Sequence, residues 1–261
     1  MPDRKISSRA LLAILPVILF HLAVNSQVHR QQNDTEESKK TIGKALRAFG
    51  RTLDFRSNFG NAYVKDRSLR EKMMRSALFD QSLDAKTVNN LRGKTLERAF
   101  FAQENYDWLT WVYFFQEDAT GNLISRDFDE FEKQIRRKAW GRLNTRQRVM
   151  YRQFLRDRNS YTTEEDRSFK SRTELLDWTG LMEQLGDALR SMIPRELRKQ
   201  FNTPFKIDAS PQPPGDFLGL KDRPSVYVSA QVKGVWGHFT FILVREQGEM
   251  RIANTVIHDG D

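Results

Sequence analysis

The stretch Gly237–Ile257, GHFTFILVREQGEMRIANTVI, decides the fold. It contains two runs, 237–245 and 250–257, that are rich in β-branched and aromatic residues. Such residues are typical of β-strands. The four residues between them, Glu246 to Glu249, include a glycine, so the pattern predicts a β-hairpin. A four-residue turn pairs Arg245 with Met250 and places His238 opposite Ile257.

Working outward from the hairpin, two more strand patterns precede it. Val226–Val232 alternates between apolar and polar residues, and Phe205–Ala209 forms a shorter run of the same kind. Between them, Ser210–Pro224 holds four of the eight prolines and two glycines, which indicates a loop or linker. We therefore expect residues 201–261 to form an antiparallel meander of three or four strands.

Residues 41–200 have the periodicity of helices, so the predicted fold class is α+β, helical first and β last, in one domain or two. Ile42, Leu46, Phe49 and Leu53 mark one helix face, and 69–79 predicts a second, short helix. The helix expected over 171–193 carries an apolar seam spaced by three and four residues. Such a seam suits either packing within the domain or pairing with a partner helix. Its residues are Leu175, Trp178, Met182, Leu185 and Leu189.

The segment Leu96–Gln116 is the most aromatic part of the chain. Read as a helix, it places Phe101, Trp108, Trp111 and Phe115 on one stripe. Aromatic side chains bury the largest area per residue, so a core position is favoured over a ligand groove. A strand over residues 109–115 remains an alternative, because aromatic and β-branched residues also suit strands.

The N-terminal segment predicts export. A basic stretch, Met1–Arg9, precedes the 15 uncharged residues of Ala10–Val24. This run is shorter than the roughly 20 residues of a membrane-spanning helix, so residues 1–26 are expected to be a cleaved signal peptide, with an uncleaved anchor as the alternative. Residues 27–40 are polar throughout and predict a flexible leader. The expected location is periplasmic or secreted, or membrane-anchored if the signal is retained.

The chain has no cysteine, which excludes disulfides, thiol catalysis and cysteine-based metal sites.

Basic residues are concentrated in one segment. Residues 133–158 hold ten basic side chains and one acidic one, a net charge of +9 that equals that of the whole chain. A helix break at 141–145 suggests a basic helical hairpin, with Asn144 and Gln147 spaced as a capping pair. The hairpin is expected either to bind anions or to be a solvated face whose arginines pair with acids such as Asp127, Asp129, Glu130 and Glu164–Asp166. The predicted anion-binding residues are Arg136, Arg137, Lys138, Arg142, Arg148, Arg152 and Arg156.

The partners expected for this hairpin are anionic lipid or a polyanionic envelope polymer. Arginine outnumbers lysine eight to two in the segment, which suits bidentate contacts to phosphate or carboxylate. Nucleic acid is a less suitable partner for an exported chain.

The end of the chain resembles a known family. The motif FILVREQGEMRIAN at 241–254 is similar to the close of an NTF2-like (cystatin-like) α+β domain, and Ile42–Asp54 is similar to the opening helix of that family. The long helical stretch between them departs from the family pattern. The resemblance implies either a small binding module with a cone-shaped pocket or an enzyme using a His–Asp pair, and no residue set of the family carries over.

The remaining chemistry is sparse. A one-residue change in hairpin register would bring His238 and His258 opposite each other, where Asp259 or Asp261 could join them in proton transfer or metal binding. The segment 118–131 fails the calcium-loop pattern because Leu123 occupies its glycine position, so a Thr-Gly-Asn turn is expected. No cofactor motif or metal site is predicted. We expect an exported, non-catalytic binding or envelope-interaction protein, with an enzyme using His238 and His258 as the alternative.

Overall fold

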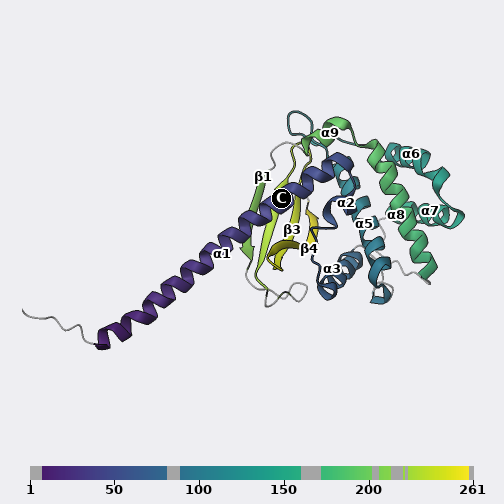
Figure 1. The fold of residues 1–261 in the computed structure, drawn as a ribbon. Coiled ribbons are helices and arrows are strands. Elements are labelled where there is room, and N and C mark those ends of the chain that lie inside the picture. Colours follow the sequence, from purple (N-terminus) through teal and green to yellow (C-terminus); the bar gives the residue numbers. More distant parts are fainter. Residues whose placement is uncertain are drawn as a thin grey trace, which may run out of the picture.

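The structure is a computed structural model that describes residues 8–80, 89–159, 172–201, 206–212, 220 and 223–258. Side chains within these ranges are described for 28–78, 89–156, 172–201, 206–211, 220 and 223–255. The fold is α+β, as predicted, with helices first and an antiparallel sheet at the C-terminal end. Figure 1 shows the sheet on one side of the body and the helices α8, α6 and α7 on the other.

The four strands form one antiparallel sheet in chain order: β1 (Lys206–Gln212), β2 (Ser225–Gln231), β3 (His238–Glu246) and β4 (Glu249–His258). All four lie where the strand patterns predict them. β1 runs three residues beyond Ala209, into the segment expected to be a loop. The other edge of β4 contacts the segment 62–64 through two backbone hydrogen bonds: the amide of Val64 donates to the carbonyl of Ile252, and the amide of Ile252 donates to the carbonyl of Ala62.

The hairpin turn has the predicted register at its closed end, where Arg245 pairs with Met250. Farther along the register shifts at Ile242/Leu243, because Ala253 is an extra residue on β4. Such a bulge displaces every later pair by one residue. The expected pairing of His238 with Ile257 is therefore wrong, and His238 lies opposite His258.

The aromatic core lies between one face of the sheet and the helices α1 (Ser8–Thr52), α2 (Phe55–Phe59) and α5 (Gly93–Phe114). Trp108 of α5, 1 % exposed, stacks on Phe239 of β3 with ring centroids 4.5 Å apart. Phe49 and Phe59 pack against the same indole ring. The core interpretation of the aromatic stripe is thus confirmed for Phe101 and Trp108. Trp111 and Phe115 are instead partly exposed and stack with Trp236. The strand alternative for 109–115 is wrong up to Phe114, where α5 ends.

The predicted flexible leader over 27–40 is wrong, because α1 continues through it without a break. Its helix is held by distant residues of the sheet. Arg245 of β3 donates to the Asp34 carboxylate at 2.6 and 2.9 Å and to Glu37 at 2.6 Å, and the Met250 amide donates to Glu37 at 3.1 Å. A polar stretch without apolar periodicity can form a helix when long-range ion pairs hold it in place.

A second layer of helices lies beyond α5. α8 (Arg172–Met192) packs along α5, and the predicted seam residues from Leu175 to Leu189 are buried there. Because α5 covers this seam, it is not exposed to a second chain. Gly186 allows the close approach of α8 to α5: a Cβ added there would lie 2.8 Å from the side-chain amide nitrogen of Asn105.

α3 (Arg67–Asp80), predicted over 69–79, packs on the side of α5 near β4, and α9 (Arg195–Gln200) joins α8 to the sheet.

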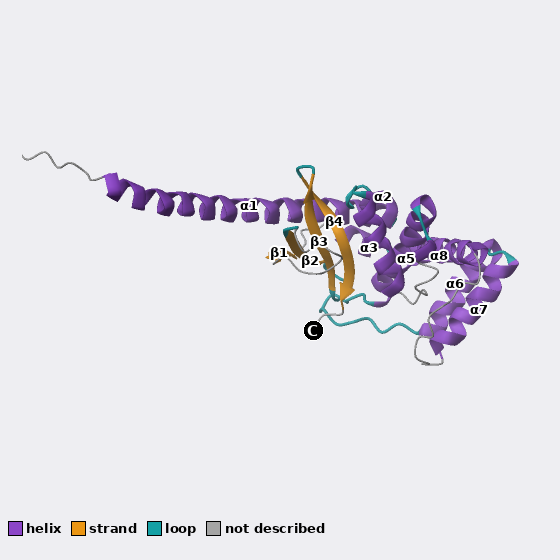
Figure 2. Ribbon diagram, turned by 90° about the horizontal axis from the view of Figure 1, so that it is seen from below, coloured by secondary structure: helices purple, strands orange, loops and turns teal. Residues whose placement is uncertain are grey.

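The molecule is elongated, with the N-terminal part of α1 at one end and the basic segment at the other. Figure 2 shows the N-terminal part of α1 projecting from the body on one side and the helices α6 and α7 forming the other end. Among the residues whose side chains are described, no helix is long and apolar enough to cross a membrane. The side chains of the predicted signal segment lie outside the described residues.

Candidate anion-binding site

The basic segment forms a helical hairpin with two well-defined helix starts. It consists of α6 (Phe128–Ala139), the 3₁₀ turn η1 (Trp140–Arg142) and α7 (Thr145–Asn159), and we call residues 128–159 the α6–α7 hairpin. The Asp127 carboxylate caps α6 by accepting from the amides of Asp129 and Glu130 at 2.7 and 3.2 Å. Asn144 and Gln147 exchange two hydrogen bonds of 2.8 and 2.9 Å, which confirms the predicted capping pair.

One face of the hairpin is docked on α8. Phe131, Ile135 and Leu143 are buried, and the ring of Phe154 packs edge-on against Trp178 at 5.8 Å. Asp177 of α8 accepts a 3.0 Å hydrogen bond from Asn144. These contacts leave the opposite face of the hairpin turned to solvent, and most of the basic side chains lie on it.

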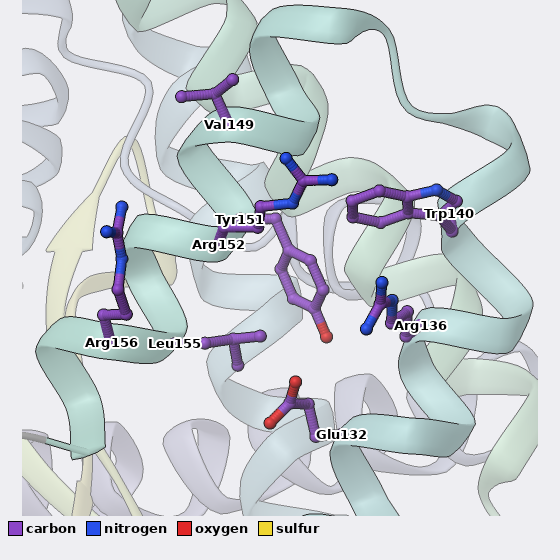
Figure 3. A pocket seen from close by; sticks show the side chains of 8 residues that line it. All are labelled: Glu132, Arg136, Trp140, Val149, Tyr151, Arg152, Leu155 and Arg156. Carbon is purple, nitrogen blue, oxygen red and sulfur yellow. The ribbon is translucent and has the colours of Figure 1, made fainter.

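A pocket of about 910 Å³ opens on this outer face, between α6 and α7. We call it the Trp140 pocket, and Figure 3 shows the side chains that line it. They combine three arginines, one carboxylate, two aromatic rings and two aliphatic groups. The lining residues are Glu132, Arg136, Trp140, Val149, Tyr151, Arg152, Leu155 and Arg156.

Trp140 organises the positive charge around the pocket. The guanidinium carbons of Arg136, Arg152 and Arg148 lie 4.9, 5.1 and 5.3 Å from the centroids of its rings. Arg148 also donates to the Trp140 carbonyl at 3.3 Å. Each cation–π contact at an exposed site contributes about 0.5–1 kcal/mol, enough to favour these rotamers but not to neutralise the charges. The indole ring therefore gathers three guanidinium groups that would otherwise repel one another.

We call the seven predicted anion-binding residues, from Arg136 to Arg156, the cationic face. Within the described part of the chain, none of them forms an ion pair with a carboxylate. Arg146, a basic neighbour outside this set, does pair with Asp177 at 3.6 Å. Asp127, one of the acids expected to neutralise the arginines, is used as a helix cap. The acids at 164–166 lie outside the described residues.

The structure brings only part of the predicted set into one site. Arg136, Arg152 and Arg156 line the Trp140 pocket, and Arg148 reaches its tryptophan. Arg137, Lys138 and Arg142 are exposed on the hairpin outside the pocket lining.

Five pocket residues lie outside the predicted anion-binding set: Glu132, Trp140, Val149, Tyr151 and Leu155. Tyr151 of α7 is 3 % exposed. However, Figure 3 shows its hydroxyl group directed into the pocket, between the Glu132 carboxylate and the Arg136 guanidinium. Burial, followed by the nearby negative charge of Glu132, raises the pKa of this hydroxyl, so it stays protonated and available as a donor.

The structure gives little support for a catalytic or metal-binding site at His238 and His258. The bulge brings the backbones of His238 and His258 opposite each other, but the side chain of His258, together with Asp259 and Asp261, lies outside the described residues. The described partner of His238 Nδ1 is the Ser229 hydroxyl at 2.9 Å. Among the described residues, no three His, Asp or Glu side chains gather as metal ligands.

The segment after α5 forms the expected turn. The Asp118 carboxylate accepts hydrogen bonds from the amides of Thr120 and Asn122 at 2.8 and 3.0 Å. Gly121 supports the turn with a φ of +84°, a conformation that favours glycine. The Asp118 carboxylate thus stabilises the turn through hydrogen bonds to nearby backbone amides.

Comparison of the chain with known protein families, with curated proteins and with solved structures yields no match. The resemblance to NTF2-like domains therefore stays a prediction. The functional argument depends on the geometry of the site alone.

Proposed function

We propose that the protein is a non-catalytic binding protein that holds a polyanion on the cationic face of the α6–α7 hairpin. The observation that carries this proposal is the arrangement around Trp140. Three guanidinium groups gather on one indole ring beside an open pocket, and no described carboxylate pairs with them.

The physical argument concerns uncompensated charge. Like charges placed close together destabilise the folded chain, and nearby carboxylates usually neutralise such clusters. Here the neutralising partner is absent from the described chain, whereas cation–π contacts hold the arginines together. Guanidinium groups present a planar fork of donors that matches carboxylate and phosphate. A ligand with several such anionic groups supplies the missing counter-charge.

The direction of α1 favours a polymer over a lipid surface. In both views, the N-terminal end of α1 and the α6–α7 hairpin lie at opposite ends of the molecule (Figures 1 and 2). If the signal segment is retained as an anchor and residues 10–24 sit in a membrane, the same bilayer does not reach the cationic face. An extended polyanion of the cell envelope is then the partner that this geometry suits, and the proposed location is the exported one expected from the N-terminal segment.

Binding to polyanions tests the proposal. The full-length chain is titrated with polygalacturonate, inorganic polyphosphate, duplex DNA, and phosphatidylglycerol or phosphatidylcholine vesicles, at 20 and 300 mM NaCl. We expect polymer binding at low salt that weakens at high salt, because salt screens exposed charges.

Matched variants then locate the site. Arg152→Glu with Arg156→Glu reverses two charges of the cationic face. Lys44→Glu with Lys233→Glu makes the same change in net charge at exposed positions elsewhere. We expect the first pair to lower polymer affinity at least tenfold and the second less than twofold. Equal losses in both would mean that net charge alone drives binding, and the absence of polymer binding at low salt would refute the proposal.

A further inference from the structure

We infer that the polyanion carries hydroxyl groups beside its anionic groups, and that Tyr151 and Glu132 recognise them. The inference rests on the proposed function and adds the chemical class of the ligand. The class is an acidic glycan or polyol, in which each carboxylate or phosphate has hydroxyl groups on neighbouring carbons.

The first observation is the hydroxyl group of Tyr151. The residue is 3 % exposed, yet its oxygen forms no hydrogen bond with any described residue. The oxygen is not one of the fully buried polar atoms without a partner in the described chain, so it is reached through the open pocket. Since this hydroxyl points into the Trp140 pocket (Figure 3), a ligand group that enters the pocket can supply the partner.

The second observation is the Glu132 carboxylate, which lies beside the Tyr151 hydroxyl in the pocket (Figure 3). It is half-buried and forms no ion pair or hydrogen bond with a described residue. A carboxylate can only accept hydrogen bonds, and it repels other anions. In a site that binds only anionic groups, this carboxylate would weaken binding. A ligand hydroxyl, in contrast, can donate to Glu132 while it accepts from Tyr151.

The rest of the pocket suits such a ligand. Among the lining residues, Arg136 and Arg152 offer anion contacts, and Val149 and Leu155 offer aliphatic contacts. Val149 is 54 % exposed. A volume of about 910 Å³ lies near the upper end of the range of about 300–1,000 Å³ for small-molecule sites, so it admits more than one repeating unit of a polymer.

The test compares two polymers of equal anionic chemistry. Polygalacturonate carries a carboxylate and free hydroxyl groups on each unit, whereas poly-L-glutamate carries a carboxylate and a backbone amide but no hydroxyl group. The affinity of the full-length protein for each is measured by titration at low salt. We expect a preference of about tenfold for polygalacturonate, the size that one or two hydrogen bonds with a charged group produce.

Two variants connect this preference to the pocket. Tyr151→Phe should reduce it to twofold or less while leaving the affinity for polyglutamate unchanged. Glu132→Gln should raise the affinity for polyglutamate, because it removes a repulsive charge, and should also reduce the preference. Tyr227→Phe, on the sheet, serves as the matched control and should preserve it. Circular dichroism and Tm verify that each variant is folded, and Glu132→Gln alone decides if Tyr151→Phe does not fold.

The outcomes separate the two proposals. Equal affinity of the wild-type protein for both polymers, or a preference that Tyr151→Phe and Glu132→Gln leave intact, overturns the inference but leaves the proposed function standing. Failure of both polymers to bind at low salt overturns both.

Discussion

Asp107 on α5 provides a stability prediction that can be worked from the structure. Its side chain is half-buried, and its described hydrogen bonds come from the side-chain amide of Gln103, at 3.1 and 3.2 Å. Burial raises the pKa of Asp107 from its ordinary 3.8 to about 7, against the smaller, opposing effect of the Gln103 hydrogen bonds. In the folded chain, the group therefore stays protonated through the acidic range.

The sign of the effect on stability follows from this pKa. Between about pH 4 and pH 7, Asp107 is ionised in the unfolded chain and protonated in the folded one, so the folded state binds more protons. The free energy of unfolding then falls as the pH rises through this window. At 1.36 kcal/mol for each pH unit, a rise from 3.8 to about 7 sets an upper limit of about 4 kcal/mol on the loss.

Asp107→Asn removes the ionisable group and keeps an oxygen that accepts from Gln103. We expect the variant to match the wild-type protein at pH 4 and to exceed its free energy of unfolding by about 2–4 kcal/mol at pH 8. Urea unfolding followed by tryptophan fluorescence at pH 4, 6 and 8 measures the difference. Asp208→Asn, at an exposed position, is the control and should change stability by less than about 0.5 kcal/mol at each pH. A difference between Asp107→Asn and wild type that does not grow with pH would refute the reasoning.

Two further predictions concern local structure. Arg245→Met removes the arginine partner of Asp34 and Glu37 and leaves Glu37 with the Met250 amide, so we expect faster hydrogen exchange over residues 28–40 and a loss of about 2 kcal/mol in urea unfolding; unchanged exchange would show that α1 does not need these ion pairs. Asn144→Ala removes the cap of α7 and should lower the free energy of unfolding by about 1 kcal/mol, whereas an effect within error would mean that Gln147 alone is enough to fix the helix start.

Local patterns predicted those parts of the fold that depend on neighbouring residues. The alternation and the glycine turn located the hairpin, and the spacing of Asn144 and Gln147 located the start of α7. The bulge at Ala253 has no such local signal, because it arises where β4 also contacts the segment before α3. The helix over 27–40 was missed for the same reason, since its partner Arg245 lies about two hundred positions away in the chain.

The candidate site was predicted in composition but not in geometry. The excess of arginine over 133–158 identified the cationic face, because net charge is visible in the sequence alone. The pocket was not visible, because it forms only when α6 and α7 pack side by side and bring Glu132 next to Tyr151. Trp140 gave no signal as a lone tryptophan near a helix break, and its role follows from the three guanidinium groups around it.

Hydrogen exchange of the full-length protein with and without polygalacturonate tests the central claim most directly, because it reports where the polyanion is bound. The account predicts slower exchange within residues 132–156, with little change in the sheet or over 28–52. Binding accompanied by protection of the sheet or of α1, with the α6–α7 hairpin unaffected, would contradict the account.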